Sequence, residues 1–196
     1  KIIGPRDRVV VYYSGHGKMR TIYAQDGREI KQGFIVPYDS NKEKFATNIP
    51  MQTIVESILA CPAKHKLLIL DCCYSGFAAI RAGEPQRNSK PAQLYLKEIT
   101  SKSAIQVLAA GQEDQAVADS GIRPGLSVFT GGLLDILEME RDLDNDGVLT
   151  ASEIGFNLEK QLIHHQNPVY QRPIYTHISG SQGGDFVFKL FNMNIS

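Results

Sequence analysis

The chain has 196 residues, 42% of them hydrophobic, and carries 21 basic and 21 acidic side chains. This composition predicts a globular chain with one sizeable core, and the zero net charge argues against a global attraction to nucleic acid or to anionic membranes. No apolar run approaches the roughly 20 residues that span a bilayer, and the first residues lack the pattern of a signal peptide, so we expect no membrane partner.

The first half of the chain alternates strand and helix signals. In chain order it predicts a strand at 9–13, a hairpin around Asp26-Gly27 with arms at 21–24 and 34–36, a helix at 51–59 and a strand at 67–70. We expect Thr47 or Asn48 to cap the helix. The strand at 67–70 (LLIL) has the continuous apolar character of strands that are buried on both faces of a parallel sheet.

The second half continues the alternation. In chain order it predicts a surface loop at 82–92, a helix at 94–101, a strand at 105–109, a Gly-rich loop at 111–125, helices at 127–139 and 152–164, and a strand at 185–190. This order favours a single α/β domain with parallel strands over residues 1–196. The apolar strand at 9–13 should have neighbours on both sides, so we expect further strands before Lys1 or in another chain.

Two short segments at predicted strand ends carry residues suited to cysteine catalysis, namely SGHG at 14–17 and DCCYSG at 71–76. The carboxyl ends of parallel strands lie at the same edge of a sheet, so His16 and Cys73 can face each other. A histidine base, a thiol and the backbone N–H groups of Gly17 and Cys73 would supply proton transfer, a nucleophile and an oxyanion site. Taken alone, a histidine in a turn is usually a solvated side chain, and a cysteine at a strand end is usually a small buried one.

Together, these segments resemble the caspase-like clan of cysteine peptidases, whose histidine lies about 50 residues before its cysteine. Within the clan, DCCYSG resembles the second motif of the metacaspase and bacterial caspase-like branches. Residues 111–119, residues 125–129 and the terminal GGDFVF also look like this family's small-subunit half. The resemblance implies a caspase-like three-layer sandwich around a mostly parallel central sheet, whose first strands precede the histidine strand and are missing from this chain.

The resemblance also implies the role of each catalytic residue. Cys73 becomes the nucleophile and His16 the base of a dyad that needs no cofactor, with the N–H groups of Gly17 and Cys73 holding the oxyanion. Cys72 becomes a packing residue whose side chain points away from that of Cys73. Because three cysteines with two adjacent make a poor disulfide framework, we expect a reducing, cytoplasmic location.

Substrate choice follows from charge. A carboxylate at the pocket favours a cationic side chain. In the resembling metacaspases, an aspartate and a serine at the positions of Asp71 and Ser14 line a pocket for Arg or Lys, and Asp119 is a further candidate here. Judged from the residues alone, Asp71 is alternatively a helix cap or a turn acceptor. The exposed loop at 82–92 is the expected site of self-cleavage, with Arg81, Arg87 and Lys90 as candidate positions.

Residues 142–153 match the twelve-residue calcium loop D-x-D-x-D-G-x5-E. The predicted ligands are Asp142, Asp144, Asp146, Val148 through its carbonyl, Thr150 and Glu153. Such loops usually come in pairs and this one is solitary, so the alternative is an acidic, solvated loop that caps a helix. Metacaspases are commonly activated by calcium through acids elsewhere in the domain, for which only Asp39 is an obvious candidate.

The leading hypothesis is therefore an endopeptidase that acts on proteins or peptides after Arg or Lys. Its expected partner is an N-terminal fragment or an upstream domain of the same precursor, and calcium is a possible structural or regulatory ion. One alternative is a catalytically silent caspase-like scaffold that binds partners. The other is a calcium-responsive interaction module in which the fold is merely a carrier.

Overall fold

The protein is described here by a computed structural model that covers residues 2–41, 44–72, 92–111, 123–140, 142–143, 146–164 and 172–189. The strands are β1 (Arg8–Ser14), β2 (Gly17–Tyr23), β3 (Glu29–Ile35), β4 (Ile49–Pro50), β5 (His65–Asp71), β6 (Ala104–Ala109), β7 (Val148–Thr150), β8 (Ile174–His177) and β9 (Val187–Lys189). The helices are α1 (Met51–Ala60), α2 (Ala92–Ser101), α3 (Val128–Glu138) and α4 (Ala151–His164), with a short 3-10 turn at Phe45–Thr47. No helix within this part of the chain is long and apolar enough to cross a membrane.

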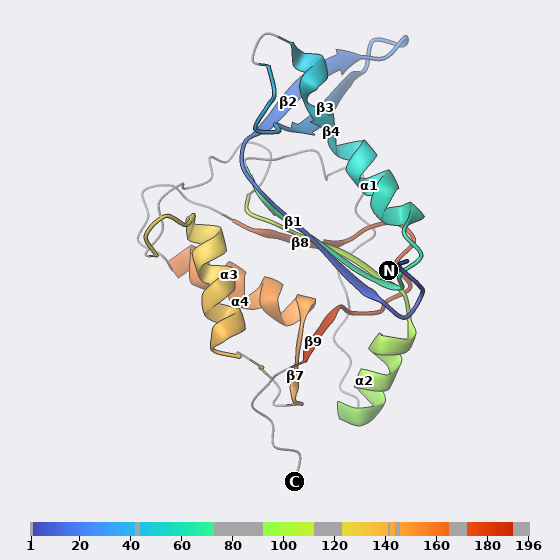
Figure 1. The fold of residues 1–196 in the computed structure, drawn as a ribbon, viewed down its shortest axis with the longest axis vertical. Helices are drawn as coiled ribbons and strands as arrows, with labels where there is room; N and C mark the ends of the chain where they lie inside the picture. Colours follow the sequence, from blue (N-terminus) through green and yellow to red (C-terminus); the bar gives the residue numbers. More distant parts are fainter. Residues whose placement is uncertain are drawn as a thin grey trace.

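A mostly parallel sheet forms the centre of the molecule, with the strand order β1-β5-β6-β8 (Figure 1). β1, β5 and β6 run parallel, and β8 is antiparallel to β6. The register places Ser14 opposite Asp71 at the carboxyl end of the β1–β5 pair. The mixed α/β architecture with a mostly parallel central sheet confirms the predicted fold class.

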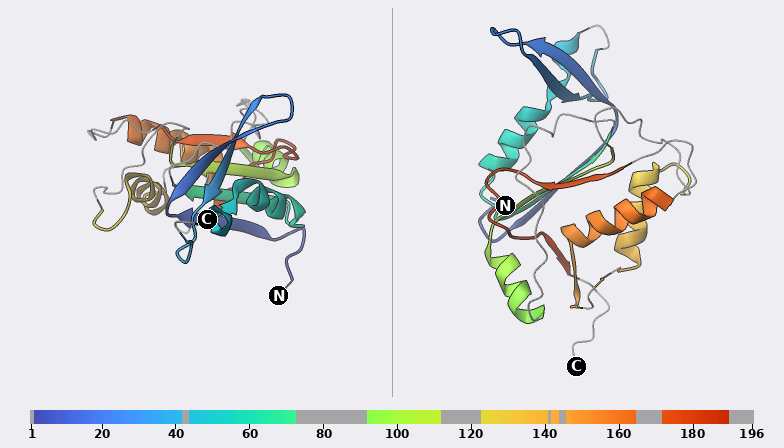
Figure 2. Two further views of the ribbon diagram at one scale, coloured as in Figure 1. Left: turned by 90° about the horizontal axis from the view of Figure 1, so that it is seen from above. Right: turned by 180° about the vertical axis from the view of Figure 1, so that it is seen from behind.

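Both faces of this sheet are covered at β5 and β6, whose residues are buried throughout and point alternately to either side. On one face, Leu67, Ile69 and Leu108 pack against α3 and α4, while on the other face Leu68 and Leu70 pack against α1. The views from above and behind show α1 on the side of the sheet opposite α3 and α4 (Figure 2). The three layers bring the carboxyl ends of β1 and β5 and the amino end of α3 together.

Two smaller sheets flank the central one. β2, β3 and β4 form an antiparallel sheet that begins directly after His16, and β7 pairs with β9 in an antiparallel ribbon. The β2–β3–β4 sheet and the β7–β9 pair lie at opposite ends of the molecule (Figure 1). The β2–β3–β4 sheet therefore continues directly from the SGHG motif, whereas the β7–β9 pair joins residues 148–150 to the end of the described chain.

Several predicted boundaries are wrong. The hairpin arms extend over Gly17–Tyr23 and Glu29–Ile35, because strand pairing begins immediately after His16. Helix α1 has Pro50 rather than Thr47 or Asn48 at its N-cap, with no capping side chain, since Thr47 instead closes the preceding turn through the carbonyl of Lys44. The strand predicted to begin at Asp185 begins at Val187 and is described as far as Lys189, and β8 was not predicted.

Candidate active site

The carboxyl ends of β1 and β5 bring the SGHG motif beside Asp71, the first residue of the DCCYSG motif. Gly15 donates its backbone N–H to the carbonyl of Asp71 at 3.1 Å, and the Ser14 hydroxyl donates to Asp71 Oδ2 at 3.3 Å. The contact between Ser14 and Asp71 joins residues 57 positions apart in the sequence. The SGHG motif therefore lies beside the first residue of the DCCYSG motif, at the shared edge that the parallel strands predicted.

The His16 loop is fixed by its backbone, while the His16 side chain is exposed. The carbonyl of His16 accepts from the N–H of Val36 at 2.9 Å and from the hydroxyl of Tyr13 at 2.9 Å. The same hydroxyl lies 3.0 Å from the carbonyl of Val36, and burial raises the pKa of this tyrosine. A Cβ on Gly15 would meet the Tyr13 hydroxyl at 2.7 Å, so glycine is required for this close approach.

The Asp71 carboxylate is buried, with only 3% of the residue exposed. Its Oδ2 atom accepts hydrogen bonds from the Ser127 hydroxyl at 2.5 Å and the Thr130 hydroxyl at 2.5 Å, in addition to Ser14. Its Oδ1 atom is buried and has no hydrogen-bond partner among the described residues. A buried anionic oxygen without a donor is unfavourable unless another group supplies one.

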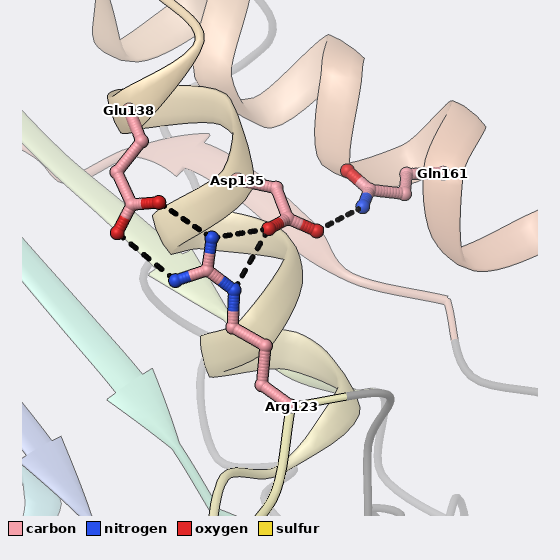
Figure 3. Close-up of polar contacts among 4 residues, drawn as sticks. All are labelled: Arg123, Asp135, Glu138 and Gln161. Carbon is pink, nitrogen blue, oxygen red and sulfur yellow. Dashed lines mark hydrogen bonds and ion pairs between the residues drawn. The ribbon is translucent and has the colours of Figure 1, made fainter.

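The amino end of α3 supplies two of these donors. Ser127 is the N-cap, and its Oγ accepts from the N–H of Thr130 at 2.9 Å. The preceding turn closes through the N–H of Leu126 and the carbonyl of Arg123, with Gly125 at a φ of 77°. Arg123 in turn binds Asp135 and Glu138 on α3, as Figure 3 shows. The turn that leads into Ser127 is thereby fastened to its own helix.

Other predicted site residues fall differently. Cys73, the predicted nucleophile and oxyanion donor, and Asp119 lie outside the described residues, as does the segment from Arg81 to Lys90. Gly17 begins β2 opposite Ile35. Cys72 is buried in the core on the α1 face, as predicted for a packing residue.

The sequence did not identify Ser127, Thr130 or Tyr12 as residues of this site. Tyr12 extends the cluster, because its hydroxyl lies 2.7 Å from that of Thr130. Serine at the start of the predicted helix was a sufficient signal for an N-cap. That its hydroxyl also reaches Asp71 depends on how α3 packs against the sheet, which no local pattern reveals.

The described part of the calcium-loop motif has a tight turn at Gly147, which is followed by β7 and α4. Gly147 has a φ of 88°, and its N–H donates to Asp142 Oδ2 at 2.8 Å. The N–H of Val148 donates to Asp146 Oδ1 at 3.1 Å. Asp144 lies outside the described residues. The part of the loop that is described therefore has the sharp glycine turn that the motif requires.

Glu153 of this loop caps helix α4. Its buried carboxylate accepts from the N–H of Leu143 through Oε1 at 3.0 Å, and from the N–H and hydroxyl of Thr150 through Oε2 at 2.9 Å each. Thr150 and Glu153 thus form a capping box. Within the described ranges, no three His, Cys, Asp or Glu side chains gather in a group that could hold a metal.

Comparison with known proteins identifies the family. The model of the caspase-domain family matches residues 4–177, which include the SGHG and DCCYSG motifs and the central sheet. No curated protein matches the chain. Because this family model covers most of the chain, including both strands whose carboxyl ends meet at Ser14 and Asp71, the chain belongs to the caspase-domain family of cysteine peptidases.

Proposed function

We propose that the protein is an endopeptidase that cleaves peptide bonds after arginine or lysine. The observation that carries this proposal is the buried Asp71 carboxylate, whose Oδ1 atom has no hydrogen-bond partner among the described residues. It lies at the sheet edge that also bears the His16 loop. A cationic substrate side chain would supply both the missing donor and the compensating charge.

The proposed chemistry uses a dyad. His16 accepts the proton of the Cys73 thiol, and the thiolate sulfur forms a bond with the carbonyl carbon of the substrate. The N–H groups of Gly17 and Cys73 hold the resulting oxyanion. When the intermediate collapses, the carbon–nitrogen bond breaks and His16 protonates the leaving amine. Water, deprotonated by His16, then hydrolyses the thioester and restores the thiol.

Peptides that differ only in the residue before the scissile bond test this function. We expect the wild-type protein to cleave after Arg and Lys but not after Asp, and Cys73→Ala to be inactive. Preferred cleavage after Asp would refute the pocket, and unchanged activity of Cys73→Ala would refute the nucleophile. If no peptide is cleaved although Cys73 is readily alkylated, the catalytically silent scaffold becomes the better hypothesis.

We also propose that the enzyme cuts itself in the loop at 82–92. The support is compositional, because this segment combines Gly, two prolines and basic residues that fit the proposed specificity. Mass spectrometry of active protein should find new termini after Arg81, Arg87 or Lys90. An intact loop in fully active enzyme would show that activity does not require this cleavage.

A further proposal is that the loop at 142–153 binds calcium. The positive φ of Gly147 and its hydrogen bond to Asp142 support it, as does the spacing of the acidic residues. Glu153 would then exchange its capping hydrogen bonds for bidentate binding of the ion. Titration calorimetry should show calcium binding that Glu153→Gln weakens at least about tenfold. Absence of heat in the wild type would leave the capping loop as the correct interpretation.

Finally, we propose that polypeptide preceding Lys1 covers the outer side of β1. Among the described strands, β1 pairs with β5 alone. Val10 and Tyr12 are 46% and 47% exposed, and a groove of about 370 Å³ lies between β1 and α1. Apolar edge strands are normally paired or covered. Hydrogen exchange of the β1 amides should slow when the preceding polypeptide is present, and equal exchange rates would contradict this proposal.

A further inference from the structure

The donor of each hydrogen bond around Asp71 can be assigned by counting protons. Each hydroxyl carries a single proton, and an ionised carboxylate can only accept. The Thr130 hydroxyl donates to Asp71 Oδ2, so its contact with Tyr12 at 2.7 Å must be donated by the tyrosine. The Ser127 hydroxyl likewise donates to Oδ2 while its oxygen accepts from the N–H of Thr130. The hydroxyl protons of Ser127 and Thr130 therefore both point toward Asp71 Oδ2, while the Tyr12 proton points toward the Thr130 hydroxyl oxygen.

This arrangement divides the two oxygens of Asp71. Oδ2 receives three hydroxyl donors, from Ser14, Ser127 and Thr130, although a carboxylate oxygen offers only about two lone-pair sites. Oδ1 receives no donor from the described residues. The hydroxyls thus fix the rotation of the carboxylate and commit one oxygen to the protein. A ligand has the other oxygen as its acceptor.

The geometry points to Thr130 and Ser127 as positioning residues that determine how the pocket recognises a cation. This inference rests on the proposed function and deepens it. Both residues belong to the amino end of α3, and the preceding turn is held to that helix by Arg123 (Figure 3). Neither touches the substrate in this scheme, since each acts through Asp71.

The hydrogen bonds to Asp71 Oδ2 also affect how strongly the pocket prefers arginine over lysine. A guanidinium group gains its advantage over an ammonium group when it binds both carboxylate oxygens in parallel. Because the hydroxyls occupy Oδ2, the pocket offers a single-oxygen contact that an ammonium makes as well as a guanidinium. We expect kcat/KM for otherwise identical Arg and Lys peptides to agree within about tenfold. An Arg preference above about 100-fold would overturn the single-oxygen arrangement.

Thr130→Val tests the positioning role, because valine keeps the branched shape of threonine and removes only the hydroxyl. We expect KM for Arg and Lys peptides to rise about tenfold, the typical effect of one hydrogen bond to a charged group, with kcat changed less than about threefold. Thr130→Ser retains the donor and should restore a KM close to that of the wild type. Tyr12→Phe removes only the outer donor and should raise KM by about twofold.

Ser127→Gly provides a second, independent removal of a donor, since glycine is nearly as good as serine at an N-cap. It should also raise KM with little effect on kcat. The rate at which iodoacetamide alkylates Cys73 should stay at the wild-type value in all these variants, because the reagent is uncharged. A lowered alkylation rate, or a lowered kcat with an unchanged KM, would show that the hydroxyls act on the fold or on catalysis rather than on the pocket.

Asp71→Asn separates this inference from the proposed function. If Asp71→Asn leaves cleavage after Arg and Lys intact, the pocket itself is wrongly assigned. If Asp71→Asn abolishes that cleavage while Thr130→Val and Ser127→Gly leave KM unchanged, the pocket stands and only the positioning role is refuted.

Discussion

Asp71 and Asp185 are two buried carboxylates with opposite hydrogen-bond patterns. Asp185 is 4% exposed, and both of its oxygens are paired. Its Oδ1 accepts from Gln106 Nε2 at 2.8 Å and from the N–H of Ser152 at 3.4 Å, and its Oδ2 accepts from the Ser152 hydroxyl. Asp71 is 3% exposed, yet its described donors all meet at Oδ2.

The difference separates an acid whose two oxygens are both paired from one that, in the proposed function, binds the substrate cation through its remaining oxygen. Asp185 joins β6 to the amino end of α4, so its hydrogen bonds hold the β7–β9 end of the molecule to the central sheet. Asp71 has an equally buried setting but leaves one acceptor to be satisfied from outside the described residues. Burial alone therefore does not distinguish the two acids, whereas counting donors on each oxygen does.

Exchanging each acid for its amide should give the largest effect. We expect Asp71→Asn to lower kcat/KM for Arg and Lys peptides by about 100-fold, because a buried charge that pairs with the substrate is lost. Asp185→Asn should change kcat/KM by less than about threefold, since the hydroxyl of Ser152 can accept from the new amide. Steady-state kinetics on both variants checks this. Equal losses would mean that the two acids do not have different functions.

The strand that carries Asp71 and its pairing with Ser14 could be predicted from the sequence. Asp71 follows a run of four apolar residues, LLIL, and this continuous pattern is what predicted a strand buried on both faces. The pairing of Ser14 with Asp71 followed from the shared edge of parallel strands, which is a rule of topology. The contacts of Asp71 with Ser127 and Thr130 span 56 and 59 residues and depend on the docking of α3, so local patterns could not reveal them.

The Asp185 region was harder to predict because polar residues are buried within its strands. β8 contains Tyr175 and His177, whose polar atoms contact the buried Gln106 side chain. The sequence IYTH therefore lacks the alternation that marks a strand. Phe186 was expected to be part of a strand, but its N–H donates to the Gln106 side chain and its carbonyl accepts from Ala151.

Removing the partner of Asp185 should affect stability rather than catalysis. Gln106→Leu has a similar volume but leaves Asp185 without its amide donor and the N–H of Phe186 without an acceptor. We expect the free energy of unfolding to fall by about 2 kcal/mol, the typical cost of leaving buried polar groups unpaired. Urea denaturation measures this loss, and kcat/KM of the folded protein should remain unchanged. A stable variant with altered specificity would contradict the structural role.

The pH dependence of stability should report on the buried Asp185 carboxylate. Burial raises the pKa of Asp185 above its ordinary value of 3.8, while hydrogen bonds from Ser152 and Gln106 oppose the shift. The folded protein therefore holds this proton more tightly than the unfolded chain does. Its stabilising contribution is fully present below about pH 4 and is lost as the pH rises through the higher folded-state pKa.

Asp185→Asn lacks this titration and provides the matched control. The difference in unfolding free energy between Asp185→Asn and the wild type should shift in favour of the variant from about pH 4 upward, and then level off. Urea titrations of both proteins across pH 4 to 8 would measure the trend. A constant difference across this range would mean that Asp185 does not titrate differently in the folded and unfolded states.

The last prediction concerns a small effect on the His16 loop, which Tyr13 contacts. Tyr13→Phe keeps the ring and removes the hydroxyl that contacts the carbonyls of His16 and Val36. The N–H of Val36 still donates to the His16 carbonyl, so the loop keeps part of its support. We expect kcat to fall two- to fivefold with KM nearly unchanged, because the loop loses a hydrogen bond that contributes about 0.5 to 1 kcal/mol to holding it in place.

This pattern is the reverse of that expected for Thr130→Val, where KM rises and kcat holds. Tyr13 contacts the His16 loop, whereas Thr130 on α3 contacts the Asp71 carboxylate, so the two hydroxyls should affect different kinetic constants. Parallel measurements of kcat and KM on both variants would establish this division. If both variants changed the same constant, the His16 loop and the Asp71 pocket would have to be treated as one coupled unit.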